Sequence, residues 1–565
     1  MGHGIHGYRG DVPLLRADLV SLNCRYSHSC PALFYVRGAL EHHLSGPVLR
    51  IRQFTINDPY YDTLLHLSSS PADALFFSVY IWNAMYVERL VRDLAAIAPD
   101  RPLILGGPQA PVLADLPRQC TVVEGEIEGV ADRFYLDLVN GCLQPRYFAV
   151  SDRPFPFPYR DEDFAGELQN RQVYYESSRG CPYRCSYCLS SADNGVRHKD
   201  VGRVEEELER ILAHEPKIIR FVDRTFNDRP ERALAIWRFL AGRPERTRFH
   251  FEVAPDRFTE EMLAFLASVP AGRFQFEIGV QSTNPQTLEA VSRRMNVEQA
   301  EVNIRRLAAG DNIHLHVDLI LGLPFDDEAG YRCSFNRVFI LRPHYLQMGL
   351  LKILPGTRIS RETDLHGILS CRRPPYEILA NRWLDHAALA DLHVFGECVE
   401  AFHNNRYFRT LWRYLLGTGE EPFQFFQALL AVCRRRHFFE HSPTQELMAR
   451  LLAELAAARP DGQLLLEILR YDWLCCGHRF LPGFLEADPL AELRAVLRRD
   501  LPPSLEGHYT VRERSEFLKR CVFLEMTAPA LRQIGFAPRG ERAVVCFLPQ
   551  QTGGVMRRCR TVLLE

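Results

Sequence analysis

Three cysteines stand close together near the middle of the chain. Cys181, Cys185 and Cys188 form the pattern Cys-x-x-x-Cys-x-aromatic-Cys, directly after an extended stretch over 172–176. Three thiolates at this spacing can bind three irons of one four-iron cluster, which leaves the fourth iron open. A cluster held by four cysteines passes electrons, whereas a cluster held by three can also hold a reactant. We therefore predict an iron–sulfur cluster that binds a second molecule.

A zinc site is the main alternative for these cysteines. Structural zinc sites take four Cys or His ligands, usually with a fourth ligand at short range. No Cys or His lies between Leu189 and Arg197, and His198 is the nearest later candidate. The spacing therefore favours the cluster over zinc.

The composition indicates a soluble protein of several domains. The chain has 565 residues, of which 47% are hydrophobic and 24% charged, and its formal net charge is −2. This length predicts about three or four domains. The near balance of charge gives no reason to expect nucleic acid or a membrane surface as a partner.

The cysteine usage and the N-terminal segment predict a cytoplasmic protein. The 16 cysteines are mostly scattered singly, unlike the dense disulfide framework of a small secreted chain. Residues 1–11 lack the apolar core of a signal peptide. No stretch reaches the roughly 18 consecutive apolar residues that a membrane helix needs. A reducing cytoplasm also suits an oxygen-sensitive cluster.

Strands and helices alternate from residue 13 to about residue 145. We expect strands at 15–22, 48–55, 74–80, 102–107 and 120–123, and helices at 31–44 and 84–97. The third of these strands is almost entirely apolar, as strands buried on both faces are. The alternation predicts a first domain over 1–145 with a doubly wound, Rossmann- or flavodoxin-like parallel sheet. Such sheets bind ligands beyond the carboxyl ends of their strands.

A second alternating region follows a stiff linker. Residues 146–170 are rich in Pro, Phe, Arg and Asp, which predicts an irregular strap. Over 171–370 we expect strands at 172–177, 218–223, 248–253, 273–280, 314–321 and 345–353. Six such units predict a partial (β/α) barrel with its chemistry at the carboxyl ends of the strands. The cysteine loop follows the first strand and should lie at that end.

The pattern changes after about residue 370. We expect helices at 376–392, 406–416, 422–436, 442–457 and 462–469, whereas 513–523 is ambiguous and 543–548 is more strand-like. The remainder of the chain, 371–565, is therefore predicted to be a mainly helical domain. The fold class of the whole chain is α/β.

The cysteine motif, with Tyr187 before the third cysteine, resembles that of the radical S-adenosylmethionine (SAM) enzymes. In that family the open iron of a 4Fe-4S cluster chelates the amino and carboxylate groups of SAM. The resemblance implies that one electron from the cluster breaks the sulfonium bond and releases a 5'-deoxyadenosyl radical. It also implies an electron donor such as flavodoxin or ferredoxin.

The end of the second predicted barrel strand departs from the family pattern. Radical SAM enzymes often have Gly-Gly-Glu there, whereas this chain has Asp223-Arg224-Thr225. The resemblance implies that Asp223 or Thr225 receives SAM or the substrate. An ordinary Asx turn is the alternative.

The fourth predicted strand carries Glu277 and Gln281, polar residues in a strand that should be buried. A buried carboxylate needs a partner because leaving it unpaired is costly. The run Gly279-Val280-Gln281 resembles that of family members like coproporphyrinogen dehydrogenase, which implies that Gln281, and secondly Glu277, binds the SAM ribose. The same resemblance implies that Arg293 pairs with the SAM carboxylate, and a solvated arginine at a helix end is the alternative.

Two later segments extend the resemblance. The run from Asp318 to Pro324 is similar to the segment that packs on the adenine of SAM. Pro355-Gly356-Thr357 matches the strand end of radical SAM enzymes that are fused to cobalamin-binding domains.

The N-terminal domain resembles the cobalamin-binding domain of those fusion enzymes. The residues that would line the cofactor are Ser78, Asn83, Gly106, Gly107 and Gly125. Glycine turns and short polar side chains let the backbone approach a bulky ligand. The Asp-x-His-x-x-Gly cobalt-ligand motif is absent, and Val123 replaces the first glycine of the usual Gly-Glu-Gly-Glu. We expect His28, in the corresponding loop, to form hydrogen bonds rather than to bind cobalt.

These resemblances predict a cobalamin-dependent radical SAM enzyme that methylates an unreactive carbon of a small-molecule or peptide substrate. A rearrangement, cyclisation or oxidation without methyl transfer is the alternative. A third possibility is a non-catalytic protein that binds an iron–sulfur cluster or a corrinoid. The C-terminal helices resemble an uncharacterised domain found after this pair in some family members, and we expect them to cap the barrel mouth or shape substrate access.

Overall fold

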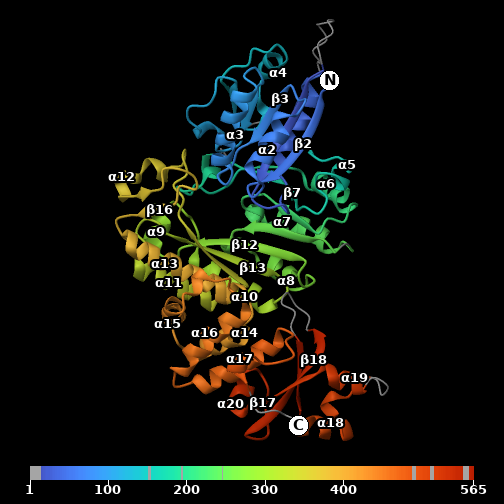
Figure 1. Cartoon of the computed structure of the whole chain (residues 1–565), viewed down its shortest axis with the longest axis vertical. Coiled ribbons are helices and arrows are strands. Elements are labelled where there is room, and N and C mark those ends of the chain that lie inside the picture. Colours follow the sequence, from blue (N-terminus) through green and yellow to red (C-terminus); the bar gives the residue numbers. More distant parts are fainter. Residues whose placement is uncertain are drawn as a thin grey trace.

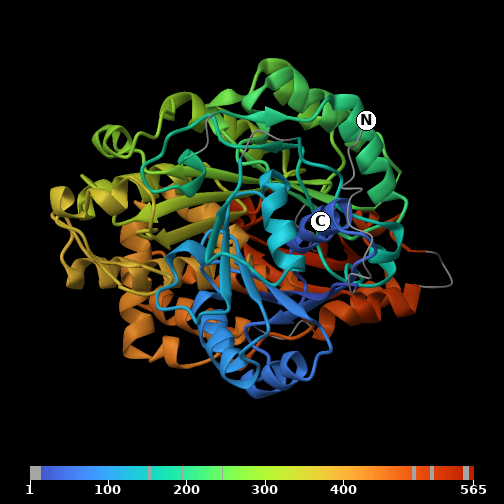
Figure 2. The ribbon, with the colours of Figure 1, turned by 90° about the horizontal axis from the view of Figure 1, so that it is seen from above.

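The computed structural model describes residues 14–150, 154–192, 195–244, 246–486, 491–509, 514–551 and 559–564. The chain forms three regions that follow one another along the long axis of the molecule (Figure 1). Seen from above, the N-terminal region lies in front of the other two (Figure 2). Among the described residues, no helix has both the length and the apolar character that crossing a membrane requires.

The first region is a parallel sheet in the strand order β2-β1-β3-β4-β5-β6. Its strands are β1 (Arg16–Asn23), β2 (Val48–Thr55), β3 (Ala74–Ser78), β4 (Leu103–Gly106), β5 (Cys120–Glu124) and β6 (Arg146–Phe148). Its main helices are α1 (Pro31–His43), α2 (Tyr60–Ser68), α3 (Ala84–Ile97) and α4 (Asp132–Val139). The helix α1 contacts α4, whereas α2 contacts α3. The predicted doubly wound sheet is therefore confirmed, and its order reverses beside β1, where such sheets bind ligands.

The sheet continues into the segment that we expected to be an irregular linker. Strand β6 pairs with β5, and its Tyr147 is buried with its hydroxyl 2.7 Å from Asp137 on α4. A short helix, α5 (Asp161–Ala165), follows in the same segment. Because Tyr147 is buried, this stretch belongs to the core of the first region, although its proline content predicted an irregular linker.

The second region is a partial barrel. Its strands are β7 (Val173–Tyr175), β10 (Ile218–Phe221), β11 (Arg248–Val253), β12 (Phe274–Gln281), β13 (His314–Leu321) and β14 (Tyr345–Leu350). All neighbouring pairs are parallel, and the strands lie in sequential order with β7 and β14 at the two edges. The helices are α6 (Val201–Leu212), α7 (Pro230–Ala241), α8 (Glu260–Ala267), α9 (Pro285–Ala290), α10 (Val297–Gly310) and α11 (Glu328–Ile340). This confirms the predicted partial (β/α) barrel.

The two faces of the barrel strands differ in chemistry. In β12 the side chains of Phe274, Phe276 and Ile278 are fully buried, and the residues between them are only half-buried. The buried rings pack with Phe251 of β11 and Trp237 of α7. Because side chains alternate along a strand, the opposite face presents polar residues, among them His250 and Glu277.

The third region begins with helices and ends with a small sheet. Its helices include α13 (His386–Val399), α14 (Arg409–Thr418), α15 (Pro422–Arg435), α16 (Gln445–Ala457), α17 (Gly462–Cys475), α18 (Ala491–Arg499), α19 (Arg514–Arg520) and α20 (Ala528–Gln533). A π-helical turn, η7 (Glu400–Asn404), joins α13 to the segment before α14. Three antiparallel strands close the chain: β17 (Val522–Thr527), β18 (Arg542–Gln551) and β19 (Cys559–Leu564). The strand-like pattern at 543–548 is confirmed.

One expectation for this region was wrong. The helix predicted at 376–392 begins only at His386, because the side chain of Asp385 caps it and Ile378–Ala380 (β16) pairs with Leu369–Ser370 (β15). Part of this region covers the edge strand β14, where both polar atoms of the Asn404 side-chain amide bond to the backbone of Leu346.

The aromatic layer between the barrel sheet and its helices should dominate the stability of the second region. Replacing Phe251, which is fully buried among five aromatic rings, by Ala should lower the free energy of unfolding by about 3–5 kcal/mol. The control Phe480→Ala removes a ring that is 82% exposed and should change stability by less than about 0.5 kcal/mol. Equal losses in chemical denaturation would contradict this assignment.

Candidate functional site

The cysteine loop leaves the first barrel strand through a turn that only glycine fits. Gly180 has a φ of 95°, and a Cβ added there would lie 2.1 Å from the carbonyl oxygen of Gly195. The backbone N–H of Ser186 donates to Val291, and its carbonyl accepts from Ile359. Contacts from several parts of the barrel therefore fix the loop that carries the three cysteines.

The three cysteines line one cavity of about 210 Å³ at the carboxyl ends of the barrel strands. All three are unbridged thiols, and only Cys185 is fully buried. The polar residues in the same wall include Arg224, Thr225, Glu252, Glu277, Gln281, Arg293 and Asp318. Among the described residues, no three Cys, His, Asp or Glu side chains converge on a single metal ion. A cubane cluster does not need that arrangement, since each thiolate binds a different iron.

The position of His198 argues against a zinc site. His198 lies on β9 (Arg197–His198), and its Nε2 is 3.0 Å from the carboxylate of Asp228. It is absent from the wall of the cysteine cavity. The set of donors in the cavity is thus three thiols with polar groups around them, which fits a cluster that binds a further molecule.

The two candidates at the end of β10 occupy different places. Thr225 lines the cavity, with its Oγ1 3.7 Å from the Sγ of Cys181. Asp223 is fully buried behind the wall, and its carboxylate accepts hydrogen bonds from the backbone and hydroxyl of Ser177 and the hydroxyl of Ser178. Asp223 therefore holds the start of the cysteine loop in place, and Thr225 is the one that faces the cavity.

A β-bulge turns Gln281 into the cavity. The pairing of β12 with β13 shifts between Gly279 and Gln281, and Gln281 has a φ of 71°. A Cβ at Gly279 would lie 2.3 Å from the amide nitrogen of Gln281, so a larger residue there would displace the Gln281 side chain. The Oε1 of Gln281 is buried without a hydrogen-bond partner among the described residues. Bulges often re-aim a side chain beside a functional site, and the orphan oxygen is available to a ligand.

Arg293 lies against the cysteine loop. Its guanidinium donates to the carbonyl of Gly279 at 2.5 Å, lies 3.9 Å from the Sγ of Cys185 and sits over the ring of Tyr183. Its Nε is buried without a hydrogen-bond partner among the described residues. A buried donor left free at the cavity wall suits an anionic group of a ligand.

Glu277 has the partner that its burial requires. His250 lies 3.1 Å from its carboxylate, and Arg220 lies 3.5 Å away. Burial alone would raise the pKa of Glu277, but the hydrogen bond from His250 and the charges of His316 and Arg220 lower it to about 2. Glu277 is therefore ionised at neutral pH.

Two cavity residues were missed by sequence reasoning, Arg224 and Glu252, and Asp318 was named only as the start of the run that resembles the adenine segment. Burial raises the pKa of Glu252 to about 7, and no hydrogen bond or ion pair engages its carboxylate within the described part of the chain. Asp318 pairs with His316 at 3.1 Å, and burial raises its pKa. The signal was available, because Glu252 and Asp318 are polar residues on buried strands, as Glu277 is.

A second cavity of about 340 Å³ lies at the carboxyl ends of the N-terminal strands. Ser78, Gly106, Gly107 and Gly125 line it, as the sequence predicted for a bulky ligand, together with apolar residues of α1. Asn83 does not line it. The Asn83 amide instead donates to the carbonyls of Leu22 and Ser78 and accepts from the backbone of Tyr80, which fixes the turn after β3.

Two glycines of this cavity have conformations that other residues rarely adopt. Gly107 has a φ of 97°, and its Cβ would lie 2.6 Å from the carbonyl of Val79. Gly125 has a φ of 93°. His28 lies outside this cavity and bonds through Nδ1 to the hydroxyl of Tyr174 at 2.7 Å, as expected for a hydrogen-bonding histidine.

The two cavities meet. Arg224 and Ser190 line both of them. Arg224 is exposed to solvent within the cavities, and no hydrogen bond of its guanidinium is present among the described residues. A ligand in the N-terminal cavity would thus face a ligand on the cysteine loop across this arginine.

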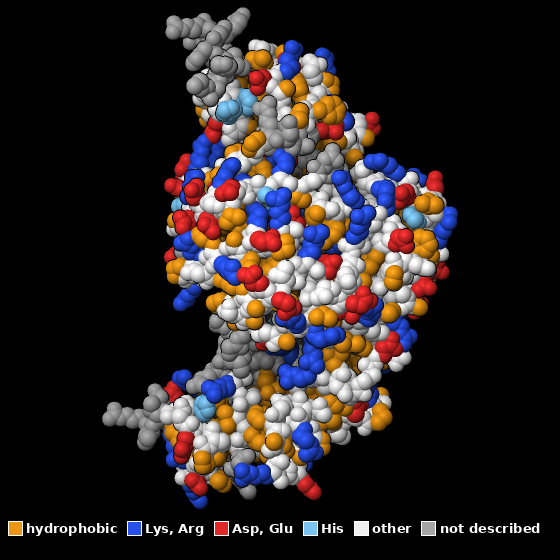
Figure 3. All heavy atoms as spheres, turned by 180° about the vertical axis from the view of Figure 1, so that it is seen from behind, with side chains coloured by type: hydrophobic (Ala, Val, Ile, Leu, Met, Phe, Trp, Pro, Cys, Tyr) orange, Lys and Arg blue, Asp and Glu red, His pale blue; other side chains and the backbone are white. Residues whose placement is uncertain are grey.

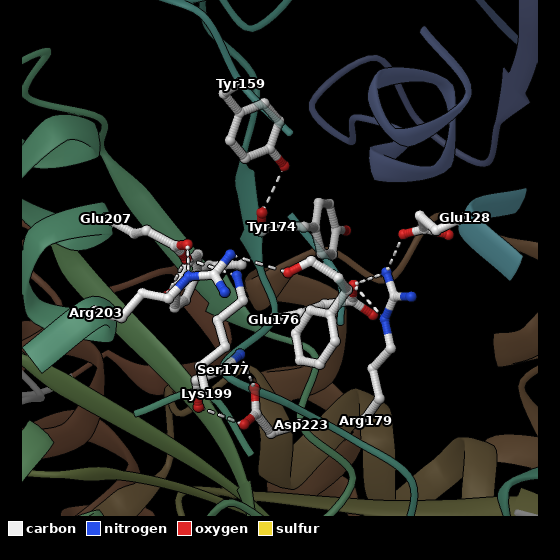
Figure 4. Close-up of polar contacts among 12 residues, drawn as sticks. Glu128, Tyr159, Tyr174, Glu176, Ser177, Arg179, Lys199, Arg203, Glu207 and Asp223 are labelled. Atoms are coloured by element: carbon white, nitrogen blue, oxygen red, sulfur yellow. Dashed lines mark hydrogen bonds and ion pairs between the residues drawn. The ribbon is translucent and has the colours of Figure 1, made fainter. Parts of the chain in front are cut away.

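A buried arginine joins the domains beside this junction. Arg179, two residues before Cys181, contacts Glu128 and Glu126 of the N-terminal region at 3.0 and 3.1 Å and Glu176 at 2.7 Å. Figure 4 shows its guanidinium pointing to Glu128 and Glu176, with the Ser177–Asp223 and Lys199–Glu207 contacts nearby. The cluster loop is therefore tied directly to the wall of the N-terminal cavity.

Comparisons with known proteins agree with this arrangement. Residues 175–330 match the family described as the radical SAM superfamily, and residues 364–499 match a family described as a protein of unknown function (DUF4080). The chain thus carries a radical SAM domain and, after it, the uncharacterised domain that the sequence suggested.

Two curated relatives match about half of the chain. The 2-(S-pantetheinyl)-carbapenam-3-carboxylate methyltransferase of Streptantibioticus cattleyicolor is 28% identical over 339 residues, covering 52% of this chain and 49% of the relative. The cobalamin-dependent radical SAM methyltransferase TokK of Streptomyces tokunonensis is 25% identical over 332 residues, covering 51% and 48%. The matches therefore span about half of each relative's length.

Two solved structures share the fold. OxsB, a cobalamin-dependent SAM radical enzyme solved with aqua-cobalamin, gives a TM-score of 0.57 at 16% identity, covering 86% of this chain and 84% of its own. TsrM, a radical SAM methyltransferase from Kitasatospora setae solved with tryptophan and a SAM analogue, gives a TM-score of 0.54 at 15% identity, covering 75% and 99%. The likeness confirms the α/β fold class.

The raised pKa of Glu252 predicts a pH dependence of stability in the cofactor-free protein. The folded state holds the Glu252 proton up to about pH 7, whereas the unfolded state loses it near the ordinary value of 4.5. Stability should therefore fall as pH rises between these values and stay level above them. Glu252→Gln should remove that slope, so its advantage over the wild type should grow by on the order of 2 kcal/mol between about pH 5 and pH 8.

The measurement is urea denaturation of both proteins across that pH range. The control Glu261→Gln removes a carboxylate that is exposed and paired with Arg238, and its stability should run parallel to that of the wild type. A parallel profile for Glu252→Gln as well would contradict the assignment.

Proposed function

We propose that this chain is a cobalamin-dependent radical SAM enzyme that methylates an unreactive carbon. The observation that carries the proposal is that the cavity of the three cysteines and the cavity of the N-terminal sheet share Arg224 and Ser190 as walls. A methyl donor and a radical source must face one substrate, and these two cavities open toward each other. The methyltransferase activities of the two curated relatives support the same reaction.

Different residues of the cysteine cavity would bind the cluster and the separate groups of SAM. Cys181, Cys185 and Cys188 would hold the 4Fe-4S cluster, Gln281 and Glu277 the ribose of SAM, and Arg293 its carboxylate. Thr225 would contact SAM at the cluster, and Asp223 would position the loop. When bound, the cluster supplies the electron that cleaves SAM and the corrinoid supplies the methyl group.

Glu252 and Arg224 would contact the substrate rather than SAM. The carboxylate of Glu252, with a pKa near 7, can hold or release a proton at neutral pH. Arg224 lies between the two cavities with its guanidinium available. Their charges favour a substrate with a polar group close to the carbon that is methylated.

Ser78, Gly106, Gly107 and Gly125 would hold the corrinoid, with Asn83 fixing the turn behind it. The left-handed glycines allow the backbone to approach a large planar ligand. We further propose a cytoplasmic enzyme that acts on a small-molecule or peptide substrate and receives electrons from a flavodoxin- or ferredoxin-type donor. A reducing compartment suits a solvent-accessible cluster.

The cluster assignment predicts a spectroscopic and a catalytic outcome. Anaerobically reconstituted wild type should be brown and, with SAM, reductant and unmethylated cobalamin as methyl acceptor, should release 5'-deoxyadenosine and S-adenosylhomocysteine above background. Cys188→Ala should lose the cluster absorption and reduce 5'-deoxyadenosine to the level without enzyme, because one iron loses its thiolate. The control Cys333→Ala, which removes an exposed thiol on α11, should behave as the wild type. Equal products from both variants would contradict the assignment.

The corrinoid assignment is tested by filling its cavity. Gly106 has an ordinary φ, and the nearest atom to an added Cβ is 3.9 Å away, so Gly106→Leu should fold with its side chain in the cavity. Cobalamin binding, followed by absorbance after gel filtration, should weaken at least about tenfold. The control Gly38→Leu places the same side chain on the exposed side of α1 and should leave binding unchanged. Unchanged cobalamin binding by Gly106→Leu would show that the corrinoid does not bind in this cavity.

A further inference from the structure

A large cavity in the described part of the chain lies away from the cysteines. It has a volume of about 830 Å³ and is formed by the end of α10, the loops before β13 and β14, and α14. Those loops lie at the amino ends of the barrel strands, opposite the cysteine loop. No lining residue is shared with the cysteine cavity. We call it the arginine cavity.

The charge of this cavity is strongly positive. Its wall contains five arginines and a single carboxylate: Arg305, Arg342, Arg406, Arg409, Arg413 and Asp311. Asp311 is already engaged by His344 at 3.0 Å and by Arg409 at 3.7 Å. Figure 3 shows Lys and Arg side chains gathered at the level where the barrel meets the C-terminal region.

Three of these arginines have a guanidinium group that makes no hydrogen bond or ion pair among the described residues: Arg305, Arg342 and Arg413. Other arginines near the junction of the barrel and the C-terminal helices have a structural role, because they form ion pairs with carboxylates. Arg332 pairs with Glu421, and Arg459 pairs with Glu420 and Asp461. Arg305, Arg342 and Arg413 lack such partners among the described residues, so docking of the helices does not account for these three.

Aromatic groups also line the arginine cavity. Trp412 and Phe339 belong to its wall, and the Trp412 Nε1 is buried without a hydrogen-bond partner in the described structure. Burial lowers the pKa of His403 to about 4, and the charge of Arg406 acts in the same direction. His403 is therefore neutral and adds a polar ring rather than a charge. The wall offers a donor and flat apolar surfaces beside the guanidinium groups.

The backbone around the arginine cavity is irregular. Arg342 has a φ of 59°, a left-handed conformation that is rare for residues other than glycine. His403 lies in the π-helical turn η7. Such strained or widened turns collect at ligand sites, where the surrounding fold must hold them.

We propose that the arginine cavity binds a small molecule that carries a phosphate or diphosphate group. The planar fork of arginine matches phosphoryl oxygens two at a time. A volume of about 830 Å³ lies within the range of ligand pockets and leaves room for an organic part against Trp412. The C-terminal helices would thus give the barrel a second ligand site, separate from the reaction cavity.

The test is calorimetric titration of the full-length protein with pyrophosphate, inorganic phosphate and succinate. Pyrophosphate should bind, phosphate should bind more weakly, and succinate should not bind measurably. The double variant Arg305→Gln, Arg413→Gln should weaken pyrophosphate binding at least about tenfold, and it removes two exposed charges that make no internal contact. The matched control Arg306→Gln removes the neighbouring charge of α10, which pairs with Glu260 outside the cavity, and should change the affinity less than about twofold.

Three results would overturn the proposal. One is the absence of pyrophosphate binding to the wild type at millimolar concentration. Another is an equal loss of affinity in Arg306→Gln, which would indicate general surface charge. The last is succinate binding as tightly as pyrophosphate, which would make this a carboxylate site. All three readouts are independent of the cluster and of SAM cleavage.

Discussion

The burial of one guanidinium between three carboxylates is the interaction on which the joint between the first two regions depends. Arg179 is almost fully enclosed, with its side chain 11% exposed, and it also lies over the rings of Tyr35 and Phe155. Glu126 and Glu128 come from the N-terminal region, and Glu176 comes from the end of the first barrel strand. A buried charge set of this kind resists the removal of any member, since the remaining charges would be left unpaired.

That joint determines the geometry of the reaction space. Arg179 stands on β8 (Ser178–Arg179), one residue before Gly180 and two before Cys181. Its contacts therefore fix the distance between the cluster loop and the carboxyl ends of the N-terminal strands. Arg197 of β9 also pairs with Glu126, so both strands that flank the loop are held. The relative placement of the two cavities therefore depends on these ion pairs.

Much of the fold follows from sequence periodicity. The strands over 48–55, 248–253 and 314–321 lie where the pattern predicts them, because buried parallel strands leave long apolar or alternating runs. Glu277 was recognisable as a polar residue on such a strand. The same rule applied to Glu252 and Asp318 would have found them without any structure.

Other features depend on contacts that a sequence does not display. Asp223 and Thr225 are two residues apart, yet one is turned inward to Ser177 and the other faces the cavity. Asn83 stabilises a turn through the carbonyl of Leu22, which is distant in sequence. The five cavity arginines come from α10, the loop before β14 and the segment around α14. Their local sequence does not indicate that these arginines line one cavity. They come together only because the third region packs on the barrel.

The amide of Asn404 has a consequence for the solubility of the barrel. A sheet that does not close has two edges, and an uncovered edge strand invites pairing with another chain. The Asn404 side chain imitates a neighbouring peptide group and, at 2.9 Å in both directions, occupies the backbone donor and acceptor of Leu346 on β14. A chain shortened after β14 would lose this cover and expose a template for strand addition. The C-terminal helices therefore protect the barrel from self-association, whatever else they bind.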